Sequence, residues 1–315
     1  MGDKPTAEEV ISYFDTLSNW GRWGDDDRLG TLNLITAEHR RNAAALVTTG
    51  DVVSLSRDID PKDPDPLHSG IGVVQRFMEL GEISHYFGDD VRVDGVAEYV
   101  GLIGHGSHTH LDGLAHYQWD GKNYNGFDAN ATNSLGGAEK LSIHHASDGI
   151  ITRGVLLDIA GLHGVRWLDG GHAIMPDELA AAEQRQGVRV SAGDALLVHT
   201  GHVARALDEP DRKFGDPAAG LHAACLPYLR ERDIAVLGSD CIQDVQPSGY
   251  DTMDLFRPIH AVGLVALGLW LIDNVELTEL AGECSRRRRW EFLFTMLPWR
   301  FVGVTASATN PVAVL

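Results

Sequence analysis

The first fifty residues carry apolar positions at helical spacing. Behind a capping box formed by Thr6 and Glu9, one helical face holds Val10, Ile11, Phe14 and Leu17. A second, alanine-rich helix begins after Thr36 and continues to Val47. The stretch 20–33 between them is rich in Gly, Asp and Trp, which predicts an ordered loop. We expect a helical extension over about residues 1–50, followed by a strand at 52–55.

The rest of the chain alternates β-type and helical patterns. Short apolar runs predict strands at 99–103, 154–159, 195–199, 234–237 and 292–297. Helical spacing is found at 176–184 and 220–232. The only stretch rich in chain-breaking residues, DIDPKDPDP at 58–66, is too short for a domain linker and predicts a loop. Since no repeat of 20 to 50 residues is visible, we expect one mixed α/β domain over residues 1–315.

Charge and hydropathy exclude several classes of protein. Acidic residues outnumber basic ones 45 to 26, and a formal charge of −19 repels nucleic acid and anionic lipid. The longest uncharged apolar stretch, 261–272, is shorter than a bilayer span. The first twenty residues contain no apolar signal core, so we expect a cytoplasmic protein. Three widely spaced cysteines form no CxxC pair and are interpreted as buried thiols.

Histidines are concentrated in one window, GHGSHTHLDGLAHYQWD at 104–120. The twelve residues 105–116 hold four histidines, where the composition predicts about 0.6. If 106–112 is extended, the period of two places His108, His110 and Asp112 on one face. Imidazole and carboxylate ligands without thiolates suit zinc, manganese or iron in a catalytic site. His116, four residues beyond Asp112, is placed near such a metal as a general base.

Other interpretations of this window compete with a metal site. The histidines could belong to a polar surface loop, or to a core in which backbone groups satisfy them. Ser107 beside His108, or Ser239 beside Asp240, could serve as a nucleophile, but the sequence contains neither a GxSxG elbow nor an SxxK motif. The glycines of 101–106 match no nucleotide-binding fingerprint. The metal site remains the favoured prediction.

The stretch Thr109 to His116 resembles the His-x-Asp-x-x-x-His signature of the cyclase family of metal-dependent hydrolases, which includes bacterial kynurenine formamidase, isatin hydrolase and a trans-dienelactone hydrolase. Further blocks resemble that family in the same order: RGVLLD at 153–158, GDALLVHTG at 193–201, VLGSD at 236–240 and MLPWRFVGVTASATNPVAVL at 296–315. The segments 23–33 and 120–126 look like a larger subgroup of it. The resemblance covers most of the chain and implies a swivelling β/β/α architecture.

The resemblance also implies a metal-binding residue set. His260 stands where the family has a histidine about a dozen residues before a Glu-Asn pair, and Asp273-Asn274 stands in place of that pair. The apolar run after His260 predicts a short buried helix that ends at Gly268, then a strand that delivers Asp273. We therefore expect His110, Asp112, His260 and Asp273 to bind one or two divalent ions, Zn²⁺ or Mn²⁺.

One family histidine is missing. The family has another histidine four residues before the one that matches His110, and this chain has Gly106 there. His108 could replace it, because the alternation argument places it on the strand face, and His105 could reach in from the loop instead.

The function implied is hydrolysis of a small amide, cyclic amide or lactone, with water activated by the metal and His116 as the base. Nearby aromatic residues suggest an aromatic or cyclic substrate, with Trp23, Tyr117 and Tyr124 as candidate substrate-binding residues. An alternative is cyclisation of a poly-β-carbonyl metabolite by a lyase or isomerase, and a third is a metal-dependent structural protein. The family also implies a homodimer or homotetramer.

Overall fold

A nine-stranded mixed sheet forms the centre of the computed structural model, which describes residues 4–60, 75–88, 90, 92–209, 211 and 215–315. Within these ranges the sheet strands, in spatial order, are β1 (Val52–Ser54), β15 (Val312–Val314), β13 (Glu291–Met296), β7 (Ile150–Asp158), β9 (Ala195–His199), β11 (Val236–Ser239), β12 (Trp270–Asp273), β4 (His110–Asp112) and β14 (Ala306–Ala308).

The middle of the sheet is parallel and its two sides are antiparallel. Strands β7, β9, β11 and β12 run parallel, whereas β4 pairs antiparallel with both β12 and β14. All five residues of β9 and all four of β12 are buried, as expected for strands covered on both faces. The short strand β4 is therefore held on both sides by backbone hydrogen bonds, which fixes the positions of its two polar residues, His110 and Asp112.

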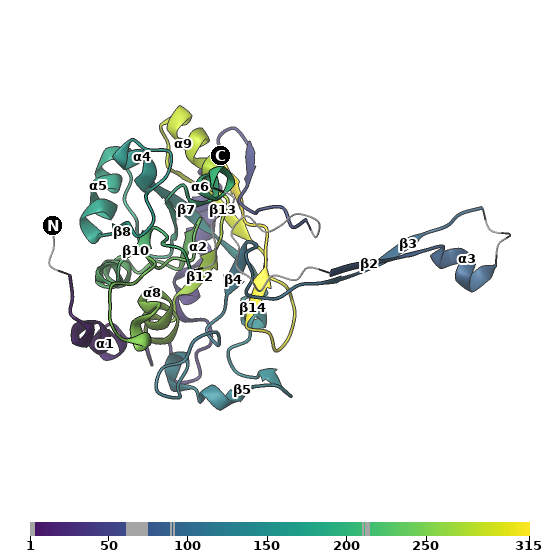
Figure 1. Cartoon of the computed structure of the whole chain (residues 1–315), viewed down its shortest axis with the longest axis horizontal. Helices are drawn as coiled ribbons and strands as arrows, with labels where there is room; N and C mark the ends of the chain where they lie inside the picture. Colours follow the sequence, from purple (N-terminus) through teal and green to yellow (C-terminus); the bar gives the residue numbers. More distant parts are fainter. Residues whose placement is uncertain (1–3, 61–74, 89, 91, 210, 212–214) are drawn as a thin grey trace.

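Most of the helices lie beside this sheet, whereas α3 lies on a projecting arm (Figure 1). The α-helices of the described ranges are α1 (Ala7–Thr16), α2 (Ala37–Ala44), α3 (Glu82–Phe87), α4 (Ile159–His163), α5 (Pro176–Gln186), α6 (His202–Asp208), α7 (Leu226–Arg232), α8 (Pro258–Val262) and α9 (Thr278–Arg287). The predicted capping box of Thr6 and Glu9 is present at the start of α1. The helix expected over 220–232 is shorter than predicted, because β10 (Gly220–Leu221) forms there instead and pairs with β8 (Ala173–Ile174).

The segment that precedes β12 folds as the sequence indicates. Helix α8 continues into a single π-helical turn, η7 (Gly263–Leu267), and Gly268 ends it with a φ of 62°. A Cβ atom on Gly268 would lie 2.4 Å from Cε2 of Tyr124, so neither the backbone conformation nor the space allows another residue. The predicted order of buried helix, glycine and strand is confirmed, and it places His260 and Asp273 at opposite ends of one compact unit.

An arm extends away from the sheet and helices (Figure 1). It consists of β2 (Gln75–Leu80), α3 and β3 (Val96–Gly101), with β2 and β3 paired antiparallel. Strand β3 covers part of the strand predicted at 99–103, and most of the loop predicted at 58–66 lies outside the described residues. Two short strand pairs lie outside the large sheet. One is the antiparallel pair of β5 (Thr132–Asn133) and β6 (Gly137–Ala138), and the other is the parallel pair of β8 (Ala173–Ile174) and β10 (Gly220–Leu221). None of the helices described has the length and apolar composition needed to cross a bilayer.

Candidate metal centre

Two neighbouring strands place three of the predicted ligands together. In the antiparallel pair of β4 and β12, His110 lies directly opposite Asp273. Side chains that are directly opposite share one face of a sheet, and His110 and Asp112 share that face because they are two residues apart. Nε2 of His110 is 3.4 Å from Oδ1 of Asp112. One potential ligand atom from each of His110, Asp112 and Asp273 lies within 4.8 Å of the others.

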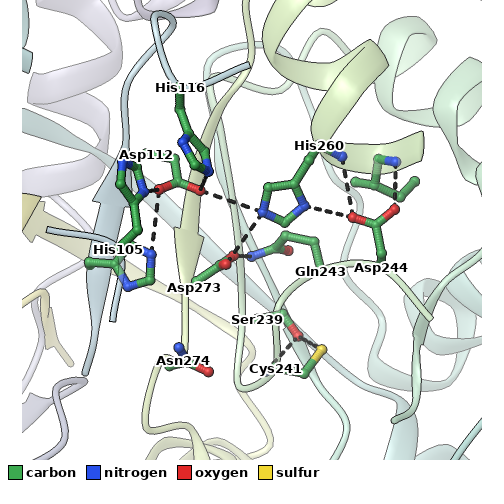
Figure 2. A network of polar contacts seen from close by, with 12 residues as sticks. His105, Asp112, His116, Ser239, Cys241, Gln243, Asp244, His260, Asp273 and Asn274 are labelled. Atoms are coloured by element: carbon green, nitrogen blue, oxygen red, sulfur yellow. Dashed lines mark hydrogen bonds and ion pairs between the residues drawn. The ribbon is translucent and has the colours of Figure 1, made fainter. Parts of the chain in front are cut away.

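Helix α8 supplies the fourth predicted ligand. His260 is fully buried, and its Nε2 lies 3.5 Å from Oδ2 of Asp112 and 3.3 Å from Oδ2 of Asp273. Figure 2 shows the imidazole of His260 between these two carboxylates and a third, that of Asp244. The structure thus brings together residues 110, 112, 260 and 273, which we call the central cluster.

Hydrogen bonds behind the central cluster set the orientation of both imidazoles. Nδ1 of His260 lies 2.6 Å from Oδ2 of Asp244, whose carboxylate also accepts the backbone N–H groups of Ile259 and His260. Nδ1 of His110 lies 2.8 Å from the carbonyl oxygen of His108. In the neutral form of each ring, Nδ1 carries the proton and donates it to its partner oxygen. Nε2 then has the free lone pair and faces the cluster. This is the usual arrangement behind histidines that bind a metal.

The residues of the central cluster fit a divalent cation. Among the described residues, Oδ2 of Asp112 and Nε2 of His260 are buried and make no hydrogen bond, which is costly unless another partner is supplied. Ligand atoms about 2.1 Å from a tetrahedral ion are about 3.4 Å apart. The separations His110–Asp112, His260–Asp112 and His260–Asp273 are 3.3 to 3.5 Å, with His110 facing Oδ1 and His260 facing Oδ2 of Asp112. The donor types, imidazole and carboxylate, suit Zn²⁺ or Mn²⁺.

A second group of potential ligands shares Asp112. Nδ1 of His105 lies 2.8 Å from Oδ1 of Asp112, and Nε2 of His116 lies 3.8 Å from Oδ2. The rings of His105 and His116 are stacked, with centroids 3.7 Å apart (Figure 2). These three residues again offer one ligand atom each within 4.8 Å of the others. Because Asp112 belongs to both groups, the geometry accommodates either one ion or two ions bridged by this carboxylate.

His108 does not follow the alternation that the sequence suggested. The backbone bends over 104–108 and strand β4 begins only at His110, so the period of two does not extend back to His108. The ring of His108 lies beside Gly106, where a Cβ atom would be 2.7 Å from Nδ1 of His108. It thus fills the space next to the position of the missing family histidine, while His105 makes the direct contact with Asp112.

The pKa values reflect charges facing one another in a buried site. Burial raises the pKa of Asp112, but His116, His105 and His110 lower it more, and it lies well below its usual range. Burial lowers the pKa of His260, but the carboxylates of Asp273, Asp112 and Asp244 raise it well above its usual value. A bound cation would take the place of that proton, because ligation requires the neutral imidazole. Burial lowers the pKa of His116 to about 4, so this imidazole is neutral at pH 7.

A cavity of about 630 Å³ opens onto the cluster. Its wall includes His105, His110, His116 and Asp273, together with residues that the sequence analysis did not single out, among them Tyr250, Phe256 and Arg257. These come from the segment just before His260, and no spacing or motif distinguishes them in the sequence. Asp244 was missed for the same reason, since it lies 16 residues from the histidine that it orients.

The three aromatic residues predicted to bind substrate do not line this cavity. Tyr124 is fully buried and donates a hydrogen bond to Oδ2 of Asp27, so it belongs to the core. Trp23 is half-buried and packs under the guanidinium of Arg22, 4.7 Å from the ring centroid. The ring of Tyr117 packs 5.4 Å from that of His260 and supports the cluster from outside the cavity. The substrate-binding role of these three residues stays a prediction.

The fold and the site define a mixed α/β protein with a buried His/Asp metal centre. A family model described as "Putative cyclase" matches residues 35–243, about two thirds of the chain, and the protein belongs to this family. A crystal structure of a novel cyclase is 29% identical, with a TM-score of 0.86 and coverage of 96% of this chain and 99% of that chain. The predicted family and fold class are confirmed.

Two isatin hydrolases share the fold at lower identity. Isatin hydrolase A from Labrenzia aggregata, solved with benzyl benzoate, is 17% identical, with a TM-score of 0.57 and coverage of 86% of this chain and 94% of its own. An isatin hydrolase bound to the product analogue thioisatinate is 17% identical, with a TM-score of 0.55 and coverage of 89% and 99%. A search among curated proteins found no match.

Proposed function

We propose that this protein is a divalent-metal-dependent hydrolase that acts on a small amide, cyclic amide or lactone. The observation that carries the proposal is the central cluster, in which Oδ2 of Asp112 and Nε2 of His260 are buried and make no hydrogen bond with any described residue. It lies beside a cavity large enough for a small organic molecule. Tyr250 and Phe256 on the cavity wall suit an aromatic or cyclic substrate. Proteins of the same fold are named isatin hydrolases, and one of them was solved with the product analogue thioisatinate, which supports this substrate class.

The residues divide into those that hold the ion and those that face the substrate. His110, Asp112, His260 and Asp273 hold the ion, and Asp244 fixes the ring of His260. When bound, a divalent cation acidifies water and polarises a carbonyl group. His116 lies on the cavity wall next to Asp112, where its neutral imidazole can accept the proton of the attacking water and return it to the leaving amine or alkoxide.

A metal-reconstituted substrate screen tests this proposal. Elemental analysis identifies the ion in the purified protein, and the screen then compares formanilides, isatins and lactones. We expect turnover of at least one class, its loss after treatment with a chelator, and its recovery with Zn²⁺ or Mn²⁺. Undiminished turnover by metal-free protein would contradict the proposal.

Cyclisation is the second candidate function, and the match to a cyclase family model favours it. Here the cavity would hold a poly-β-carbonyl compound, and His116 would move a proton without activating water. Reaction in ¹⁸O-labelled water separates the two candidates. Hydrolysis incorporates the label into the product, whereas cyclisation without hydrolysis gives an unlabelled isomer of the substrate.

A further inference from the structure

Arg257 is a cationic side chain on the cavity wall, and no carboxylate in the described part of the chain forms an ion pair with it. It lies three residues before His260, and its side chain is half-buried. Within the described ranges, its Nε is buried without a hydrogen bond and its guanidinium forms no ion pair. Its guanidinium carbon lies over the ring of Phe256, 5.5 Å from the centroid. Burying part of a guanidinium without a partner is unfavourable, so this position needs an explanation.

Several other partly buried arginines of this protein are paired with carboxylates. Arg153 forms ion pairs with Asp194 at 2.6 Å and with Glu291 at 2.9 Å, and Arg232 contacts Glu183 at 2.7 Å. With 45 acidic residues against 26 basic ones, carboxylates are plentiful in this chain. Asp251 and Asp216 lie on the same cavity wall as Arg257, yet neither is within ion-pair distance of it. The guanidinium is therefore left available to whatever enters the cavity.

A second hydrogen-bond donor without an acceptor among the described residues lies on the same cavity wall. Nε2 of Gln246 is buried and has no hydrogen-bond partner among the described residues. The backbone of Gln246 is held by two hydrogen bonds with Ala218, of 2.9 and 3.0 Å, so this donor belongs to a fixed part of the wall. Two donors without acceptors, one of them charged, indicate that the ligand supplies the acceptor oxygens.

We infer that the substrate of this enzyme carries a carboxylate separate from the carbonyl group that is attacked, and that Arg257 binds this carboxylate with Gln246 as a further donor. A carboxylate matches the geometry of a guanidinium and forms charge-assisted hydrogen bonds with it. The inference rests on the proposed function in that the bound carboxylate belongs to the substrate of the hydrolysis. Binding of the carboxylate itself depends only on the residues of the cavity wall. It narrows the substrate class to acidic amides, imides or lactones.

Binding of benzoate and benzamide to the purified protein tests this inference. The two probes have nearly the same shape and differ in charge, and isothermal titration calorimetry gives the Kd of each. We expect wild-type protein to prefer benzoate. In Arg257→Gln the Kd of benzoate should rise about tenfold while that of benzamide stays within about twofold. Arg257→Lys, which keeps the charge, should retain part of the preference.

Arg40→Gln is the matched control, because Arg40 is exposed on α2 and that helix lies outside the cavity wall. It should bind both probes as the wild type does. The inference is overturned if wild-type protein does not prefer benzoate, or if Arg257→Gln weakens both probes equally or neither. The proposed function fails on a different readout, the metal dependence of turnover, so the two failures can be told apart.

Discussion

At the scale of single residues, the structure separates two roles that the sequence window could only place near each other. Asp112 contacts His105, His110, His116 and His260, and is common to both candidate ligand groups. His116 approaches it at 3.8 Å and lies on the cavity wall. We therefore propose Asp112 as the ligand on which the centre depends, and His116 as the residue that moves a proton.

His116→Ala should therefore keep its metal and lose turnover by roughly two or more orders of magnitude, since a positioned base contributes about that factor. Elemental analysis and steady-state kinetics on the same preparation test both parts. A metal-free His116→Ala protein would show that His116 is a ligand of the second group and not the base.

A buried pair away from the metal centre gives a pH dependence. Nδ1 of His199 lies 2.8 Å from Oδ1 of Asp158. Burial lowers the pKa of His199, but Asp158 and Asp240 raise it, and the net result lies above 6.5. The pair therefore stabilises the folded protein in full below pH 6.5, and this contribution is lost as the pH rises through the folded-state pKa.

Chemical denaturation of His199→Gln and wild type at pH 6 and pH 9 measures this contribution. The free energy of unfolding lost in the variant should be larger at pH 6 than at pH 9. An equal loss at both pH values would mean that the charged form of His199 is not favoured in the folded state.

At the scale of elements, the unit from α8 to β12 shows what a sequence can predict. The apolar run after His260 predicted the buried helix, Gly268 predicted where that helix ends, and the residues leading to Asp273 predicted the strand. These predictions succeeded because each signal is local in the sequence. The alternation from Gly106 to Asp112 failed because the backbone bends before β4, and tertiary pairing with β12 and β14 decides where that strand begins. The cavity wall and Asp244 could not be predicted, since long-range packing alone brings them to the cluster.

Gly268→Ala tests this unit. The φ of 62° and the 2.4 Å approach of the Tyr124 ring predict a loss of about 2 kcal/mol or more in the free energy of unfolding. Gly282→Ala is the matched control: Gly282 lies within α9, and a Cβ atom there meets nothing within 4 Å. It should gain about 0.5 to 1 kcal/mol from helix propensity. Equal free energies of unfolding for the two variants would contradict the close packing of the Tyr124 ring against Gly268.

At the scale of the whole molecule, the arm of β2, α3 and β3 extends away from the body (Figure 1) and carries exposed apolar side chains. Tyr86, Phe87 and Tyr99 are 71%, 75% and 65% exposed. We propose that this arm is covered in a homodimer or homotetramer, the assembly that the sequence led us to expect. Sedimentation velocity should show two or four copies, and the double variant Tyr86→Ser/Phe87→Ser should shift the protein toward monomer. A monomeric wild type at micromolar concentration would contradict this.

The central claim is that side chains from β4, α8 and β12 converge to hold a divalent ion. Its most direct test is the metal content of Asp112→Ala against wild type, measured by elemental analysis after identical purification. We predict one or two equivalents of Zn²⁺ or Mn²⁺ in the wild type, and loss of both metal and turnover in a variant whose circular dichroism is unchanged. An Asp112→Ala protein that retains the full wild-type metal content would contradict the account.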